Sequence, residues 1–243
     1  MRLIDFTILS NERIARDVYC LRLSPGVNLP PPKPGCFVNI QLDGFYLRRP
    51  ISVCDWGGKR LTLIYKVVGE GTKSLAKRTA GRLSLLCWLG NGYTVADTKR
   101  PVLIGGGVGV PPLYYLAKEL LQAGQRPVAI LGFNCAEEVF YQEEFGGICE
   151  TVVTTADGSL GVKGFVTNAL ANLDYDALYT CGPEPMLKAV YRQAKDVPAQ
   201  FSFERRMGCG FGACMACSCK TVTGCKRVCM DGPILTKEEI LWT

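Results

Sequence analysis

The hydrophobic residues of the chain change their period near residue 97, which predicts two different architectures. Before that point, short runs rich in β-branched and aromatic residues are separated by groups of Pro and Gly. The expected strands cover 18–23, 36–42 and 61–68. Short strands with this punctuation predict a small antiparallel barrel over residues 1–96.

From residue 97 to about 200, apolar strands alternate with helical spacing. Strands are expected at 102–104, 127–133, 150–155 and from residue 177, with helices from Pro111 or Pro112, across 137–145 and across 166–173. The buried face of the first helix is predicted to carry Leu113, Leu116, Ala117, Leu120 and Leu121. The alternation predicts a parallel sheet that binds ligands at the carboxyl ends of its strands.

The remaining stretch, residues 201–243, is rich in cysteine. Cys209, Cys214 and Cys217 have the spacing C-x4-C-x2-C, and Cys229 follows alone. This is the plant-type spacing for a [2Fe-2S] cluster, in which one loop supplies three thiolates and a separate segment supplies the fourth. The intervening Gly208, Gly210 and Gly212 are expected to take positive φ values and let the backbone wrap closely around a cluster.

Other uses of these cysteines remain open, namely a structural zinc site, disulfides or unligated core thiols. The fourth ligand is also ambiguous, because Cys219 and Cys225 lie nearby. Cys219 is expected to point away, being two residues beyond Cys217. We favour Cys229 over Cys225 because the turn signal at 231–233 would hold it in place.

Composition narrows the class of protein. With 243 residues, 48% hydrophobic and 21% charged, the chain has the composition of a globular protein with a substantial core. It contains no apolar run of 18 residues and no signal-peptide pattern at its N-terminus, so no membrane segment is expected. Thirteen cysteines, many scattered singly, fit reduced thiols and predict a cytoplasmic protein.

Charge and the absence of histidine exclude further classes. The formal charge is +6, but a cluster and a diphosphate cofactor would bring it to about +2, and the basic residues are dispersed, so no nucleic-acid partner is expected. Two basic pairs, 205–206 and 226–227, are either ordinary solvated charges or groups that balance the cluster and dock a partner. Without histidine there is no Rieske centre and no histidine-based hydrolytic site. We expect the chemistry to come from cofactors and assign no catalytic side chain.

Two motifs within the predicted barrel suit a diphosphate-bearing flavin. Arg49-Pro50-Ile51-Ser52 offers a guanidinium for phosphate and a hydroxyl for a ring edge. Alone, the motif is more typical of an edge strand with surface arginines. About 20 residues later, the glycine turn at 69–71 leads into a short helix, capped by Thr72 or Ser74, whose free N–H groups favour an anion. Together the two motifs predict FAD.

A glycine loop follows the first strand of the second region. Gly105, Gly107 and Gly109 precede Pro112 in a spacing that departs from the dinucleotide fingerprint. The loop predicts phosphate binding, with a tight structural turn as the alternative. The end of the strand at 152–155 offers no basic residue before Lys163, so NAD is favoured over NADP.

The barrel motifs resemble the flavin site of the ferredoxin–NADP reductase superfamily. The residues that carry the resemblance are Arg49-Pro50-Ile51-Ser52, Ile64-Tyr65-Lys66, Gly71-Thr72 and the turn Gly90-Asn91-Gly92-Tyr93. The resemblance implies that Arg49 contacts the FAD pyrophosphate, that Ser52 lies near the flavin N5, and that the glycine loop receives the nucleotide pyrophosphate. It also implies that Cys181-Gly182-Pro183 lies beside the nicotinamide, the alternative being a buried structural cysteine. Cys36 and Cys87-Trp88 depart from the usual pattern without touching a proposed contact.

A closer resemblance is carried by the tail, at 204–217 and 227–233, and by the stretch 155–167. It is to the electron-transfer subunits of NAD-dependent dihydroorotate dehydrogenases, and it covers essentially the whole chain. This implies a ferredoxin-reductase-like FAD barrel, a parallel-sheet nicotinamide domain and a small [2Fe-2S] domain with ligands Cys209, Cys214, Cys217 and Cys229. It further implies an FMN-containing catalytic subunit, two copies of each subunit, and electron flow from dihydroorotate to NAD in pyrimidine biosynthesis.

Two other functions are consistent with the same sequence. The chain could be the flavin and iron-sulfur subunit of a ferredoxin–NADP, sulfide or sulfite reductase or of a hydrogenase. Those subunits share the architecture, so only the identity of the partner would distinguish this function from the first. It could also be a non-catalytic zinc-stabilised binding protein, which would be colourless when purified.

Overall fold

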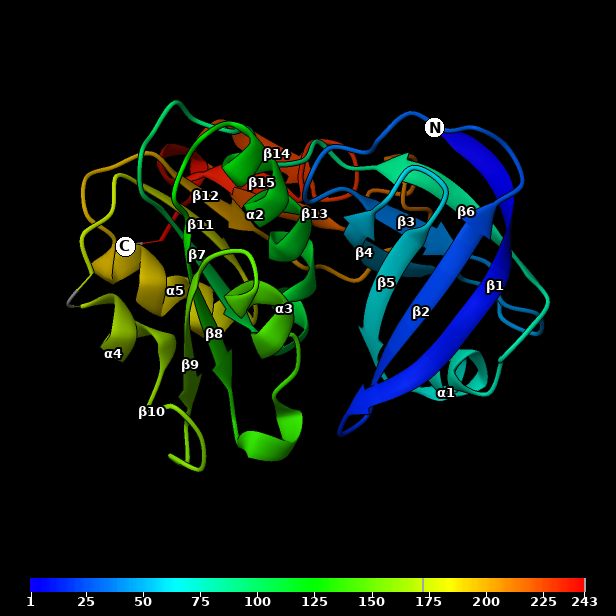
Figure 1. Cartoon of the computed structure of the whole chain (residues 1–243). Helices are drawn as coiled ribbons and strands as arrows, with labels where there is room; N and C mark the ends of the chain where they lie inside the picture. Colours follow the sequence, from blue (N-terminus) through cyan, green and yellow to red (C-terminus); the bar gives the residue numbers. More distant parts are fainter. Residues whose placement is uncertain (172, 243) are drawn as a thin grey trace.

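The computed structural model describes residues 1–171 and 173–242, in which a barrel and a sheet lie side by side (Figure 1). The barrel strands are β1 (Arg2–Ala15), β2 (Val18–Pro25), β3 (Phe37–Ile40), β4 (Arg49–Trp56), β5 (Leu61–Lys66) and β6 (Arg82–Leu89). They close in the order β1-β2-β5-β4-β3-β6, all neighbours antiparallel. The short helix α1 (Glu70–Ala76) lies at one end. The predicted barrel is therefore confirmed.

The second body is a seven-stranded sheet. Its strands are β7 (Pro101–Gly106), β8 (Val128–Phe133), β9 (Glu150–Thr155), β10 (Val162–Lys163), β11 (Ala177–Cys181), β12 (Ala199–Ser202) and β15 (Ile234–Thr236). The order is β10-β9-β8-β7-β11-β12-β15, and only the β12–β15 pair is antiparallel. The expected parallel sheet is confirmed.

Helices cover both faces of this sheet. Two short 3-10 turns, η1 (Gly107–Gly109) and η2 (Ala136–Glu138), follow strands β7 and β8. α2 (Pro111–Gln122) and α3 (Gln142–Gly146) pack on one face, and α4 (Val166–Leu170) and α5 (Glu184–Gln193) on the other. α2 lies between the sheet and barrel strand β4. Its predicted apolar face is buried, apart from Leu121, which is half-buried.

Three local predictions are wrong. The helix expected across 137–145 is broken: η2 ends at Glu138, Val139 is extended and Tyr141 is left-handed at φ 62°, so α3 begins only at Gln142. The helix expected across 166–173 ends at Leu170. The cap of α1 is Gly69, and Thr72 stands three residues inside the helix, where its hydroxyl accepts the Gly69 N–H and donates to the Gly69 carbonyl.

The cysteine-rich tail is built into both bodies. It contains the hairpin of β13 (Ser218–Thr221) and β14 (Gly224–Arg227), continues to β15, and ends after the 3-10 turn η3 (Lys237–Glu239). In Figure 1 this orange and red segment crosses between the barrel and the sheet. Because β15 pairs with β12, which itself spans the predicted boundary at residue 200, the division into 1–96, 97–200 and 201–243 remains a prediction.

Among residues 1–171 and 173–242, no helix combines the length and the apolar character needed to cross a membrane.

Candidate functional site

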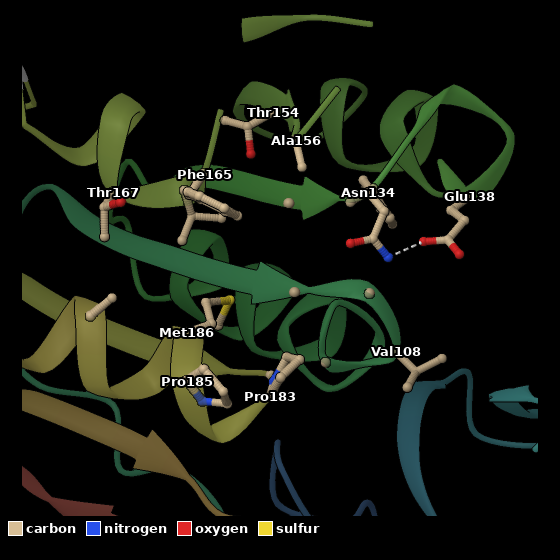
Figure 2. Close-up of a pocket in the computed structure, with 18 of the residues that line it drawn as sticks. Val108, Asn134, Glu138, Thr154, Ala156, Phe165, Thr167, Pro183, Pro185 and Met186 are labelled. Carbon is tan, nitrogen blue, oxygen red and sulfur yellow. Dashed lines mark hydrogen bonds between the residues drawn. The ribbon is translucent and has the colours of Figure 1, made fainter. Parts of the chain in front are cut away.

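A cavity of about 620 Å³ opens at the carboxyl ends of the parallel strands (Figure 2). Gly107 and Gly109 after β7, and Gly182 and Pro183 after β11, line it. Ligands of open parallel sheets bind at this edge, where the strand order reverses. The predicted Gly105 and Cys181 are the neighbouring strand-end residues, paired in register across β7 and β11.

Close packing explains the glycines of this loop. A Cβ on Gly109 would overlap the carbonyl group of Cys181, and one on Gly105 would lie 2.8 Å from Val110 Cα. Gly107 has φ +52°, a conformation that favours glycine. The loop can therefore lie against the end of β11 and leave room for a ligand at the carboxyl edge of the sheet.

The cavity walls carry few polar groups. The Thr154 hydroxyl is fully buried and, among the residues described, has no hydrogen-bond partner. Such a group is normally paired, so a bound ligand is a natural partner. Glu204, an exposed residue, also lines the cavity. Burial raises the pKa of Cys181 to about 12, so that the residue is a neutral thiol near pH 7 and not a nucleophile.

An ion cluster joins the mouth of this cavity to the barrel. Glu138 Oε1 lies 3.0 Å from Arg16 Nη2 and 3.3 Å from Lys66 Nζ, and its Oε2 accepts a hydrogen bond from Asn134 (Figure 2). Desolvation raises the pKa of Glu138, but the hydrogen bonds from Arg16, Asn134 and Lys66 outweigh it and lower the pKa to about 2. The predicted Lys66 thus reaches from β5 to the nucleotide cavity.

The predicted flavin motifs meet on the barrel. The Arg49 guanidinium lies directly on Gly71, where any Cβ would overlap it, and 4.8 Å from the centre of the Phe45 ring. Its Nη1 donates to the Leu47 carbonyl. A groove of about 450 Å³ beside it is lined by Phe45, Glu70, Lys73 and Ser74 among others. A guanidinium beside a glycine turn fits a diphosphate group.

The other predicted flavin residues take different positions. Pro50, Ile51 and Ser52 follow Arg49 on β4 and are half-buried. Ile64 is buried where the barrel meets the sheet domain. The Tyr65 side chain packs inside the barrel, stacked on Tyr19, and its hydroxyl donates to Asn11, so only its backbone could face a cofactor.

The four predicted cluster ligands form two pairs. The Cys209 N–H donates to Cys214 Sγ at 3.3 Å, and the Cys229 N–H donates to Cys217 Sγ at 3.4 Å. Within the described ranges, no three Cys, Asp or Glu side chains converge on a single ion position. All thirteen cysteines are free thiols. Two pairs of cysteines suit a cluster with two irons, each of which takes two cysteine ligands.

Backbone N–H groups point at these sulfurs. Cys209 Sγ accepts from the N–H groups of Phe211, Ala213 and Cys214, while Cys229 Sγ accepts from Gly212 at 3.1 Å. Burial raises the Cys209 pKa, but these donors outweigh it and lower the pKa to about 6. Burial and the neighbouring Cys217 raise the pKa of Cys229 to about 12. The donors around Cys209 therefore stabilise negative charge on that sulfur, as a cluster requires.

Glycines shape the loop, though not all as expected. Gly210 and Gly212 have φ of +80° and +90°, whereas Gly208 does not have the predicted positive φ. A Cβ on Gly208 would instead lie 3.0 Å from Cys214 Sγ. Arg227 links the loop to the segment after Cys229. Its Nη1 donates to the Gly212 carbonyl, and its Nε and Nη2 donate to the Asp231 carboxylate.

The two competing cysteines lie on the β13–β14 hairpin. Cys219 is buried against the sheet-domain core and Cys225 is exposed. Neither contacts the sulfurs of the two pairs through a hydrogen bond. This geometry supports Cys229 as the fourth ligand, which remains a prediction.

Sequence reasoning missed Arg16, Glu138 and Asn39. The first two lie 122 residues apart, and Asn39 on β3 contacts the Cys209 carbonyl 170 residues away. None belongs to a motif, and their contacts exist only in the folded chain.

Comparison with known proteins agrees with this arrangement. Residues 204–241 match the family described as the iron-sulfur cluster binding domain of dihydroorotate dehydrogenase B. The dihydroorotate dehydrogenase B (NAD(+)) electron transfer subunit of Fusobacterium nucleatum is 42% identical, with 99% of each chain covered. That of a Geobacillus species is 41% identical over the same shares. The chain belongs to this family. The resemblance predicted from the motifs is confirmed.

Two solved structures share this fold. An NADH-dependent reduced ferredoxin-NADP oxidoreductase superposes with a TM-score of 0.89 at 31% identity, covering 100% of this chain and 91% of that one. Phthalate dioxygenase reductase superposes with a TM-score of 0.69 at 16% identity over 90% and 87% of the two chains. The predicted ferredoxin-reductase-like fold of this dihydroorotate dehydrogenase B family member is confirmed.

Proposed function

We propose that the chain relays electrons between NAD and a partner subunit through FAD and a [2Fe-2S] cluster. The observation that carries this is the order of three neighbouring strands. β4, with the Arg49–Ser52 motif, pairs with β5 on one side and β3 on the other. Lys66 of β5 reaches the nucleotide cavity, and Asn39 of β3 reaches the cluster loop. The flavin strand therefore lies between the other two sites.

Each cofactor is assigned to residues of this chain. FAD would be held by Arg49, Gly71 and the β4 motif, NAD by the glycine loop and Cys181–Pro183, and the cluster by the two cysteine pairs. FAD supplies the conversion between the two-electron hydride of NADH and the one-electron cluster. The protein binds and orients these groups, and the loop N–H donors stabilise charge on the ligating sulfurs.

The partner in this proposal is an FMN-containing subunit that oxidises dihydroorotate, with two copies of each subunit in the complex. The relatives are named as one subunit of dihydroorotate dehydrogenase B. Exposed apolar side chains surround the cluster segments, with Phe211, Met215 and Met230 exposed to 43%, 53% and 56%. Apolar side chains gathered around a redox site suit a protein interface. In the cytoplasm the complex would supply orotate for pyrimidine synthesis.

The test is anaerobic isolation of the chain with whatever accompanies it, followed by addition of dihydroorotate and NAD. We expect one NADH per dihydroorotate consumed, with flavin and iron-sulfur absorbance bleaching before NAD is added. Chain isolated alone, reconstituted with FAD and cluster, is the control and should reduce a dye with NADH while leaving dihydroorotate untouched. A colourless protein without flavin, iron or sulfide would contradict the relay.

A second function is supported by the 31% identical ferredoxin-NADP oxidoreductase structure. In that case the accompanying subunit would exchange electrons with ferredoxin. NADH would bleach the cofactors of the isolated complex while dihydroorotate would not, and reduced ferredoxin would replace dihydroorotate as donor.

A further inference from the structure

Two asparagines of the barrel hold the two segments that carry the cluster cysteines. Asn39 lies on β3, and Asn91 lies in the turn that follows β6. Asn39 contacts the loop that contains Cys209 and Cys214, whereas Asn91 contacts the segment just after Cys229. Both asparagines are more than 100 residues away in sequence from the predicted cluster ligands.

Asn39 is 1% exposed, and its Nδ2 donates to the Cys209 carbonyl at 3.2 Å. Gly210 packs so closely on this amide that any Cβ there would overlap Nδ2. Within the described part of the chain, the Oδ1 atom of the same amide has no partner. A buried amide with one unpaired atom is unfavourable, so an apolar residue would be preferred here unless the bond to Cys209 mattered.

Asn91 clamps the second segment from both sides. Its Nδ2 donates to the carbonyls of Ile234 at 2.8 Å and Asp231 at 3.3 Å, and its Oδ1 accepts the Ile234 N–H at 3.1 Å. Its backbone N–H donates to the Gly232 carbonyl at 2.7 Å. Asp231 is the residue that fixes Arg227, which in turn holds Gly212 of the first loop.

Chain connectivity does not place these segments against the barrel. Between Asn91 and Cys209 the chain passes through the whole parallel sheet except β15. The position of the cluster loop relative to β4 is therefore set by contacts across the interface. Asn39 pairs in register with Pro50 of the flavin motif, so its hydrogen bond leads directly from that motif to Cys209.

We propose that Asn39 and Asn91 are positioning residues that set the place of the cluster relative to the flavin strand, one for each ligating segment. This inference rests on the proposed function, because it requires the cluster and FAD to occupy their assigned sites. The rate of transfer between two centres depends on how they are held relative to each other, so a displaced cluster loop would slow reduction of the cluster by the flavin.

The test compares Asn39→Leu, Asn91→Ala and Asn91→Asp with wild type in the FAD- and cluster-loaded protein. Leucine keeps the volume of Asn39 without its donor, and aspartate keeps the acceptor of Asn91 without its donors. The matched control is Gln200→Ala, since the Gln200 amide also makes two hydrogen bonds to a backbone segment, at Thr94, away from the cluster loop. The readouts are iron and sulfide per FAD, the EPR spectrum of the dithionite-reduced cluster, and stopped-flow bleaching of FAD and cluster by NADH.

We expect Asn39→Leu and Asn91→Ala to slow cluster bleaching by about 10- to 100-fold, the usual effect of removing an outer-shell partner, with an altered EPR spectrum. FAD bleaching should stay at the wild-type rate, which also shows that the barrel and sheet are folded. Asn91→Asp should slow cluster bleaching at least as much as Asn91→Ala, because its second carboxylate oxygen would face the carbonyls of Ile234 and Asp231. Loss of iron with normal FAD bleaching would equally support the proposal.

The proposal is overturned if Asn39→Leu and Asn91→Ala keep the EPR spectrum and cluster-bleaching rate of Gln200→Ala. It is also overturned if FAD and cluster bleaching slow by the same factor, which a general loss of structure would cause. Wild-type protein that binds FAD but holds no iron and sulfide after reconstitution would instead overturn the proposed function.

Discussion

At the scale of single residues, backbone N–H groups of the cluster loop stabilise negative charge on a predicted ligand sulfur. The N–H groups of Phe211, Ala213 and Cys214 all point at Cys209 Sγ. Backbone donors are not lost by side-chain substitution, so the chemistry of the loop depends chiefly on the thiols themselves and on the glycines that permit the turn.

Replacing a ligand thiol should remove the cluster selectively. We expect Cys214→Ser to abolish the cluster and partner-linked NAD reduction while NADH-to-dye reduction through FAD stays within about twofold, because Cys214 lies outside the barrel and the nucleotide cavity. Iron analysis and both activities measure this. Cys225→Ser, an exposed thiol on the adjacent hairpin, is the control and should behave as wild type. Full partner-linked activity in Cys214→Ser would contradict the electron route.

A second residue-scale prediction concerns the contact between Gly71 and Arg49. A Cβ at position 71 would displace the guanidinium, so Gly71→Ala should weaken FAD binding by about 10-fold, the value of one charge-assisted hydrogen bond. Fluorescence of FAD released on dilution measures the affinity. Gly69→Ala is the matched control, because a Cβ there meets no atom within 4 Å. Equal affinities for the two variants would remove Arg49 from the proposed site.

At the scale of elements, the loops that follow the strands decide what the sheet can bind. η1 brings Gly109 against the end of β11, and η2 brings Glu138 to the cavity mouth. A continuous helix across 137–145, as the sequence pattern suggested, would have lacked the left-handed turn at Tyr141. The turn buries Phe140 and Phe145 in the core between sheet and barrel.

The approach of η1 to β11 leads to a prediction for NADH. In Gly109→Ala the added methyl group would overlap the Cys181 carbonyl and push the glycine loop away from β11. We expect the KM for NADH in dye reduction to rise about 10-fold or more, since the dinucleotide must approach the backbone closely here. Gly146→Ala, with no atom within 4 Å of the new Cβ, is the control. An unchanged KM in Gly109→Ala would place NADH elsewhere.

At the scale of the whole molecule, the barrel, the sheet and the tail are joined by polar contacts at both ends of their interface. Tyr93 of the barrel-closing turn donates to the Thr180 carbonyl of β11 at 3.0 Å, and Asn91 holds the tail. At the cavity mouth, Glu138 joins Arg16 and Lys66 of the barrel. The relative position of the three cofactor sites follows from these contacts.

The Glu138 ion cluster should make stability depend on pH. Because the folded-state pKa of this carboxyl is lowered to about 2, its contribution is complete above its ordinary pKa of about 4.3 and is lost as the pH falls toward 2. We expect Glu138→Gln to lower the free energy of unfolding by about 1 to 2 kcal/mol at pH 7, allowing for solvent screening. The loss should become progressively smaller as the pH falls from about 4.5 to about 3.

Urea unfolding of wild type and Glu138→Gln at several pH values measures this difference. Glu150→Gln is the control, since Glu150 pairs with Arg100 on the exposed surface and should contribute little at any pH. A difference for Glu138→Gln that did not shrink with falling pH would show that the carboxylate charge is not what joins the two bodies.

The sequence by itself determined what depends on local pattern. Hydrophobic period distinguished the barrel from the parallel sheet, and the spacing of Cys209, Cys214 and Cys217 identified a candidate cluster loop, because both signals lie within short stretches of chain. Tertiary structure alone decided which distant residues meet. It broke the helix at Tyr141, turned the Tyr65 side chain into the barrel and brought Asn39 to Cys209 and Glu138 to Lys66. Such contacts join residues tens of positions or more apart, and their free energy comes from burial and charge pairing that exist only once the barrel, sheet and tail have packed together.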